Sequence, residues 1–173
     1  MLTELVVDAR LKAELARHGL DETRHACLLL ERMNELGFRA FRLPPPLDRV
    51  DALLARSRAR EVRNVYADRG TVSEAELMEL MVAAFVVKSD SVQKLGANLD
   101  ALDGDERTRR LVAELLEDER RHVASLARWM GHFEDRFSRR AVARARERLE
   151  AAFVDLDAAY YGALREYFDR VAA

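Results

Sequence analysis

Apolar residues recur along this chain at the three- and four-residue spacing of a helix, and no stretch alternates between apolar and polar residues as a strand does. The pattern predicts a first helix over about 3–36, which ends at the run GFRAFRLPPP because consecutive prolines cannot continue a helix. Gly19 is the weak point of this helix, since an interior glycine costs about 1 kcal/mol relative to alanine. Continuation through Gly19 and a break at Gly19 both remain open.

Four more helices are predicted after the prolines. Ser73 and Glu76 have the spacing of a capping box and mark the start of one of them. The short link 103–106 predicts an antiparallel hairpin between two neighbouring helices. The predicted helices run from Asp48 to about Asp68, closed by Gly70; from Ser73 to about Leu102; from the link to about Trp129–Gly131; and from Ser138 to about Val171. We therefore expect an all-α antiparallel bundle with an additional long C-terminal helix, in a single domain that spans residues 1–173.

The composition agrees with a helical globular domain, because glycine and proline are scarce, at 7 and 3 residues. The net charge of −2 predicts no strong field for nucleic acids or acidic membranes, and the arginine-rich run RFSRRAVARARER is interpreted as a solvated face. No run reaches the roughly 20 apolar residues of a membrane span, the N-terminal segment lacks a signal-peptide pattern, and Cys27 is the only cysteine. We expect a cytoplasmic protein that binds neither nucleic acid nor membrane.

Two pentads of the form D-E-x-R-H carry the candidate chemistry. They are DETRH at Asp21–His25 and DERRH at Asp118–His122, and they hold two of the four histidines. Residues three apart share a helix face, so each pentad directs one glutamate and one histidine to the same point. A carboxylate with an imidazole suits iron, manganese or zinc. The pattern predicts metal ligands at Glu22, His25, Glu119 and His122.

The stretches DETRHACLLLERMNELG and EDERRHVASLARWMG resemble two helices of the ferritin-like diiron-carboxylate superfamily, which includes rubrerythrins, bacterioferritins and diiron oxygenases. The resemblance implies an antiparallel four-helix bundle that binds two iron ions, with manganese or zinc as alternatives. It implies an oxidoreductase that uses O₂ or peroxide on a small-molecule substrate. Asp21 and Asp118 would each orient the histidine of the opposite helix, because a ligating histidine usually donates its other N–H to an acceptor such as a carboxylate.

A third carboxylate is expected from the helix that precedes the second pentad. If the hairpin turns at the centre of the link, Asp90 faces Glu119, so Asp90 is a predicted metal ligand. Lys88 is its neighbour, and a lysine directed at the site would replace the positive charge of a metal. An exposed or snorkelling side chain is the expected placement of Lys88.

The fourth carboxylate of the family pattern has no clear source in this chain. If the first helix breaks at Gly19, Glu14 approaches only the end of the bundle. His18 is either an extra ligand or, as expected, a packed side chain. A second subunit would also complete the bundle. The remaining sources lie in the last helix: Glu147, Glu150, Asp155 and Asp157.

Two functions therefore remain open. The first is a dinuclear metal protein with oxidoreductase activity. The second is a metal-free bundle with a binding or structural role, in which Lys88 or an arginine takes the place of the metal. A homodimer is expected in either case, because the last helix is rich in aromatic residues and one bundle helix is missing.

Overall fold

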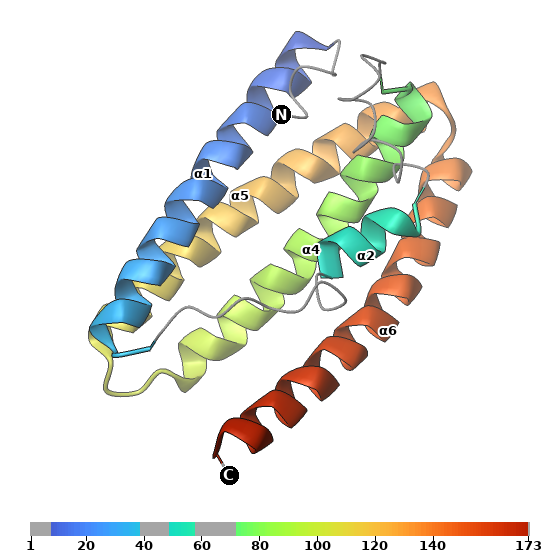
Figure 1. Cartoon of the computed structure of the whole chain (residues 1–173). Coiled ribbons are helices and arrows are strands. Elements are labelled where there is room, and N and C mark those ends of the chain that lie inside the picture. Colours follow the sequence, from blue (N-terminus) through green and yellow to red (C-terminus); the bar gives the residue numbers. More distant parts are fainter. Residues whose placement is uncertain (1–7, 39–48, 58–71, 173) are drawn as a thin grey trace.

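The computed structural model describes residues 8–38, 49–57 and 72–172, and these residues form α-helices without any strand (Figure 1). The helices are α1 (Ala9–Glu35), α2 (Arg49–Ala55), α4 (Glu74–Ala101), α5 (Glu106–Arg136) and α6 (Arg139–Ala172). The all-α prediction is confirmed for this part of the chain. Asp48, Gly70 and the predicted first turns before Asp8 lie outside the described residues.

Side-chain caps fix the starts of the long helices. The carboxylate of Asp8 accepts hydrogen bonds from the first backbone N–H groups of α1, and that of Asp105 accepts one at the start of α5. Ser73 and Glu76 form the predicted capping box of α4. α1 continues through Gly19 without a break, because cap and packing together outweigh the cost of one glycine.

α2 is shorter than predicted, since it ends at Ala55 and not near Asp68. The backbone N–H of Ser57 and its hydroxyl both donate to the carbonyl oxygen of Leu54, at 3.0 and 2.8 Å. A serine that bonds the backbone in this way competes with helical hydrogen bonds. Residues 58–71 lie outside the described chain.

α5 is longer than predicted, because it passes Gly131 and ends at Arg136. Met130 and Phe133 are buried on the core side of this last stretch. Full burial of a large apolar side chain contributes roughly 1.5–3 kcal/mol, which exceeds the cost of one interior glycine. Burial therefore decides where the helix ends.

α4 is the central helix of the bundle. It lies antiparallel to α5 after a tight link and also packs against α6 (Figure 1). The predicted hairpin is confirmed, and Gly104 in the link has a φ of 86°, a conformation that glycine adopts without steric cost. Seven successive residues of α4, Leu77–Ala83, are buried. The core around them includes Leu53 of α2, Leu126 of α5 and Leu149 of α6.

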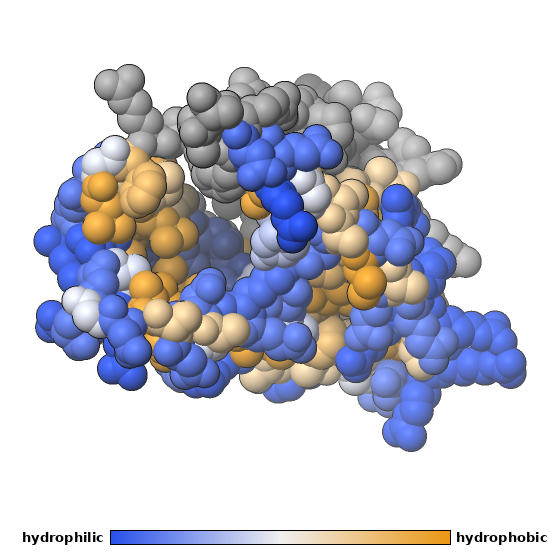
Figure 2. All heavy atoms as spheres, turned by 90° about the horizontal axis from the view of Figure 1, so that it is seen from below, coloured by the Kyte–Doolittle hydropathy of each residue, from blue (hydrophilic) through white to orange (hydrophobic). Residues whose placement is uncertain are grey.

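α1 is the peripheral helix and packs mainly against α5. Leu29 of α1 and Leu36, which follows its last turn, are 43% and 47% exposed. Seen from below, the surface is hollowed between the hydrophobic area over the end of α1, at the left, and the rest of the bundle (Figure 2). The described part of the bundle is therefore open along one side of α1. None of the described helices has the length and apolar character needed to cross a membrane.

Candidate metal centre

The two pentads meet where α1 lies antiparallel to α5. Nε2 of His25 is 2.9 Å from Oδ2 of Asp118, and Nε2 of His122 is 2.9 Å from Oδ2 of Asp21. The predicted contacts between each aspartate and the opposite histidine are therefore present. Two identical spacings on antiparallel helices produce this arrangement, because rotation by a half turn exchanges one pentad with the other.

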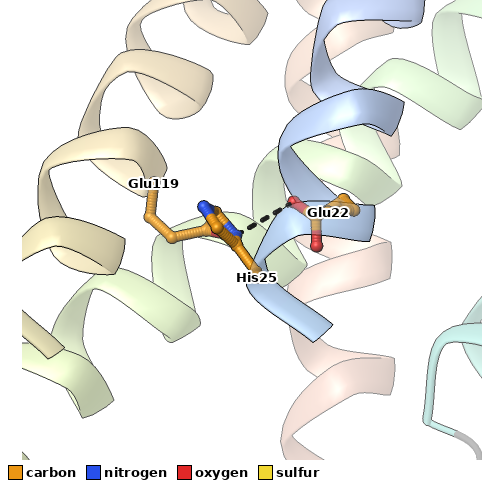
Figure 3. Close-up of side chains that lie close together, drawn as sticks. All are labelled: Glu22, His25 and Glu119. Atoms are coloured by element: carbon orange, nitrogen blue, oxygen red, sulfur yellow. Dashed lines mark ion pairs between the residues drawn. The ribbon is translucent and has the colours of Figure 1, made fainter. Parts of the chain in front are cut away.

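The two glutamates lie between the two histidines. Nδ1 of His25 is 3.7 Å from Oε1 of Glu119 and 4.0 Å from Oε1 of Glu22. Nδ1 of His122 is 3.6 Å from Oε1 of Glu22 and 4.0 Å from Oε1 of Glu119. In Figure 3, Glu22 and His25 extend from α1, and Glu119 extends toward them from α5. One ligand atom from each of these three residues fits within a 4.8 Å group. His122 lies outside this group of three, although its Nδ1 is within 4.0 Å of both glutamates.

The centre is buried at His25, Glu119 and His122 but open at Glu22, whose side chain is 47% exposed. His122 is 2% exposed and Glu119 is 4% exposed. Nδ1 of His122 and Oε2 of Glu119 are buried without a hydrogen-bond partner among the described residues. An unpaired buried polar atom costs about 1–3 kcal/mol. These two atoms are therefore the strongest indication in the described structure that the centre binds a metal ion or another ligand.

The ionisation of Asp118 sets the orientation of His25. Burial raises the pKa of Asp118, but the hydrogen bond from His25 and the charges of Arg121 and Arg24 outweigh burial and bring the pKa below its ordinary value. An ionised Asp118 accepts the Nε2 proton, so Nδ1 of His25 presents its lone pair to the centre. The two arginines were not predicted, although each occupies the fourth position of a pentad.

Lys88 of α4 also reaches the centre. Its Nζ is 2.8 Å from Oε1 of Glu119 and forms a second ion pair with Oε1 of Glu22. Lys88 was expected to be exposed or snorkelling, but its side chain is only 18% exposed and is directed at the site, which is the alternative considered for it. Its ammonium group supplies one positive charge between the two glutamates.

Asp90 does not join the cluster within the described chain, so the structure does not bring this predicted ligand to those of the pentads. Its carboxylate is 2.8 Å from Nζ of Lys94 and 3.8 Å from the guanidinium of Arg49. α4 meets the centre at Lys88, and a residue two positions further along a helix is turned by about 200°. Asp90 therefore faces α2 and α6.

His18 lies beside the centre as a packed side chain. Its ring centroid is 4.1 Å from that of His122, with the planes tilted by 41°. Burial, together with the charges of the neighbouring His122 and Lys88, lowers the pKa of His18 to about 4. His18 is therefore neutral at pH 7 and covers one face of His122.

The other candidate carboxylates remain outside the cluster. Glu14 accepts hydrogen bonds from the Ser125 hydroxyl and, at 2.8 Å, from Nε1 of Trp129. Glu14 lies toward the start of α1, and α1 passes Gly19 without the break on which the expectation for Glu14 depended. The acidic residues considered in the last helix do not join the cluster within the described chain: Glu147, Glu150, Asp155 and Asp157.

Comparison with protein-family models, with curated proteins and with solved structures gives no match for this chain. The geometry of this centre is therefore the feature of the chain that points to a function.

Proposed function

We propose that this chain is a ferritin-like metal-binding bundle that binds iron, or alternatively manganese or zinc, through Glu22, His25, Glu119 and His122. One observation carries the proposal. Two imidazole Nδ1 atoms and two carboxylate oxygens converge, while both Nε2 atoms are held by aspartates. Lys88 places one positive charge between the two carboxylates, yet Nδ1 of His122 and Oε2 of Glu119 have no hydrogen-bond partner among the described residues. Nitrogen and oxygen donors of this kind suit these divalent metals.

The donors fit one divalent ion per chain better than two. Two carboxylates neutralise one divalent cation, and the described residues supply no further carboxylate to the cluster. The family pattern needs two more for a dinuclear site. Lys88 already contributes a positive charge, so a metal ion binds only when the flexible lysine side chain moves its ammonium group away from Glu22 and Glu119.

The proposed activity is that of an oxidoreductase. Iron or manganese held by these residues would supply redox chemistry toward O₂ or peroxide. The protein's own contribution is to orient both imidazoles through Asp21 and Asp118 and to keep water from the buried side of the centre. A small-molecule substrate is part of this proposal.

The test is a metal titration of protein purified without chelator. We expect about one iron(II) per chain in anaerobic titration, with strong loss of binding in His122→Ala. His132→Ala is the matched control, because His132 is an exposed histidine on the same helix and lies outside the centre. Two irons per chain would restore the dinuclear interpretation, and equal binding by both variants would contradict the proposed site.

Lys88 favours a second candidate, a metal-free bundle with a binding or structural role. Its ion pairs with both glutamates already provide a cation at the centre. The variant Lys88→Met separates the two functions, because it removes the charge and keeps an apolar stem. If the centre binds metal, iron(II) affinity rises by about tenfold, which corresponds to ~1.4 kcal/mol. If the lysine is the permanent cation, the melting temperature falls and added metal does not restore it.

A further inference from the structure

A cavity of about 230 Å³ lies directly beside His122, between α1 and α5. It extends from the metal centre toward the start of α1, and its wall includes the rings of His18 and His122. This volume is below the roughly 300–1,000 Å³ of sites that bind drug-sized ligands. The cavity therefore fits a molecule of only a few carbon atoms.

Three guanidinium groups line the cavity. They belong to Arg17 of α1 and to Arg121 and Arg128 of α5. Arg121 is paired with Asp118. Arg17 and Arg128 are exposed and form no ion pair with any residue in the described parts of the chain. Two positively charged groups at the cavity thus have free donors.

The acidic residues of the cavity are already engaged. Oε2 of Glu14 accepts from Ser125 and Trp129, and Oδ2 of Asp21 accepts from His122. Asp118 already neutralises Arg121, so two carboxylates stand against the two guanidinium groups of Arg17 and Arg128. The carboxylates accept hydrogen bonds from the protein, whereas both guanidinium groups keep free donors that suit an anionic ligand.

We propose that this cavity binds a small organic carboxylate, with the carboxylate group on Arg17 and Arg128 and the carbon chain against the rings of His18 and His122. Guanidinium groups bind carboxylates through paired N–H donors, which fixes their orientation. As a substrate site, the cavity rests on the metal-binding function proposed above, because it would place the carbon chain beside His122. As an anion-binding site, the cavity does not depend on the proposed metal-binding function.

Trp129 provides the measurement, since it is the only tryptophan of the chain and its Nε1 donates to Glu14 at the cavity. We would titrate metal-free and metal-loaded protein with acetate, butyrate and hexanoate at constant ionic strength and follow tryptophan fluorescence. The corresponding amides are neutral controls, and inorganic phosphate tests for general anion binding. We expect saturable binding of a carboxylate and none of its amide.

Substitutions at the rim test the assignment of the ligand group. Arg17→Gln and Arg128→Gln should each weaken carboxylate binding at least about tenfold, whereas Arg110→Gln should not. Arg110 is a matched control because it is an exposed arginine of α5 outside the cavity. Equal binding of amide and carboxylate, tighter binding of phosphate, or indifference to both rim variants would overturn the proposal.

The two proposals fail separately. Metal binding without carboxylate binding would contradict only the cavity assignment. Carboxylate binding without metal would leave an anion site and contradict the proposed metal function.

Discussion

Each histidine of the centre depends on one aspartate from the other helix. Asp118 is buried and accepts from His25 at 2.9 Å, so it holds the Nε2 proton and leaves Nδ1 free for the centre. Loss of a carboxylate that orients a ligating histidine typically lowers metal affinity 10- to 100-fold. The contribution of Asp118 to metal affinity can therefore be tested by replacing one carboxylate oxygen.

We predict that Asp118→Asn lowers metal affinity about 10- to 100-fold while the helical content is retained. An asparagine side chain has nearly the same shape but carries no charge to hold the imidazole proton. Isothermal titration with zinc or iron(II) measures the change. Asp135→Asn, an exposed residue of the same helix, is the control, and equal affinities of the two variants would contradict the orienting role.

The residues of the centre were predicted to different degrees, for a physical reason. The spacing within each pentad does not depend on where its helix begins or ends, so the pentads identified four candidate donors and both aspartates. Asp90 depended on the register of the hairpin, and a shift of two residues along a helix reverses the face it presents. The signal for Lys88 was its position beside Asp90, yet only tertiary packing brings it to Glu22 and Glu119.

At the scale of the helices, α4 carries much of the core and also places Lys88. Its start is fixed by the reciprocal hydrogen bonds of Ser73 and Glu76, in which the N–H of Ser73 donates to Oε2 of Glu76 at 2.8 Å. This capping box lies about four turns from Lys88. The stability of α4 and the chemistry of the centre can therefore be separated by substitution.

We predict that Ser73→Ala lowers the free energy of unfolding by about 1 kcal/mol without changing metal affinity. The alanine removes the side-chain oxygen that accepts from the N–H of Glu76. Urea denaturation followed by circular dichroism measures the loss, and Ser73→Thr should retain most of the stability. A Ser73→Ala variant as stable as the parent would show that packing alone holds the start of α4.

Helix existence followed from periodicity, but two helix ends did not. α5 passes Gly131 because Met130, at the expected end, and Phe133, beyond it, are both buried. α2 ends early because Ser57 bonds back to Leu54. Both outcomes depend on contacts that a single helix does not reveal, namely the burial of one face and the competition of one hydroxyl for a carbonyl.

At the scale of the whole molecule, aspartates connect the helices to one another. Asp105 of α5 bonds to Arg32 of α1 at 2.7 Å, and Asp157 of α6 bonds to Lys94 of α4 at 2.7 Å. The pKa of Asp105 is lowered by hydrogen bonds from Thr108 and Arg32. Burial raises the pKa of Asp157, but Lys94 and Arg49 reverse this and lower it. Both carboxylates are thus more acidic in the folded protein than in the unfolded chain.

We predict that the melting temperature falls as the pH drops below about 4, close to the ordinary aspartate pKa of 3.9. A carboxyl group with a lowered pKa in the folded state stabilises that state above its ordinary pKa, and the contribution is lost as the pH falls toward the folded-state pKa. Thermal melts at pH 7, 5 and 3 measure the effect. Asp105→Asn keeps the helix cap but removes the charge, so its melting temperature should depend less on acid.

The homodimer remains a prediction for the assembled protein. Leu29 and Leu36 are half-exposed along the open side of α1, and sedimentation at micromolar concentration would measure the association. A monomer at that concentration would contradict it.

The half-turn relation between the pentads has a consequence for the smallest unit that can carry the centre. Asp118, Glu119 and His122 of α5 repeat the roles of Asp21, Glu22 and His25 of α1. The motif is therefore self-complementary: a helix that carries it can pair through it with a second, antiparallel copy of the same helix. Two antiparallel copies of a helix with the sequence of α5 would therefore supply all four donors of the centre and both aspartates that orient the histidines.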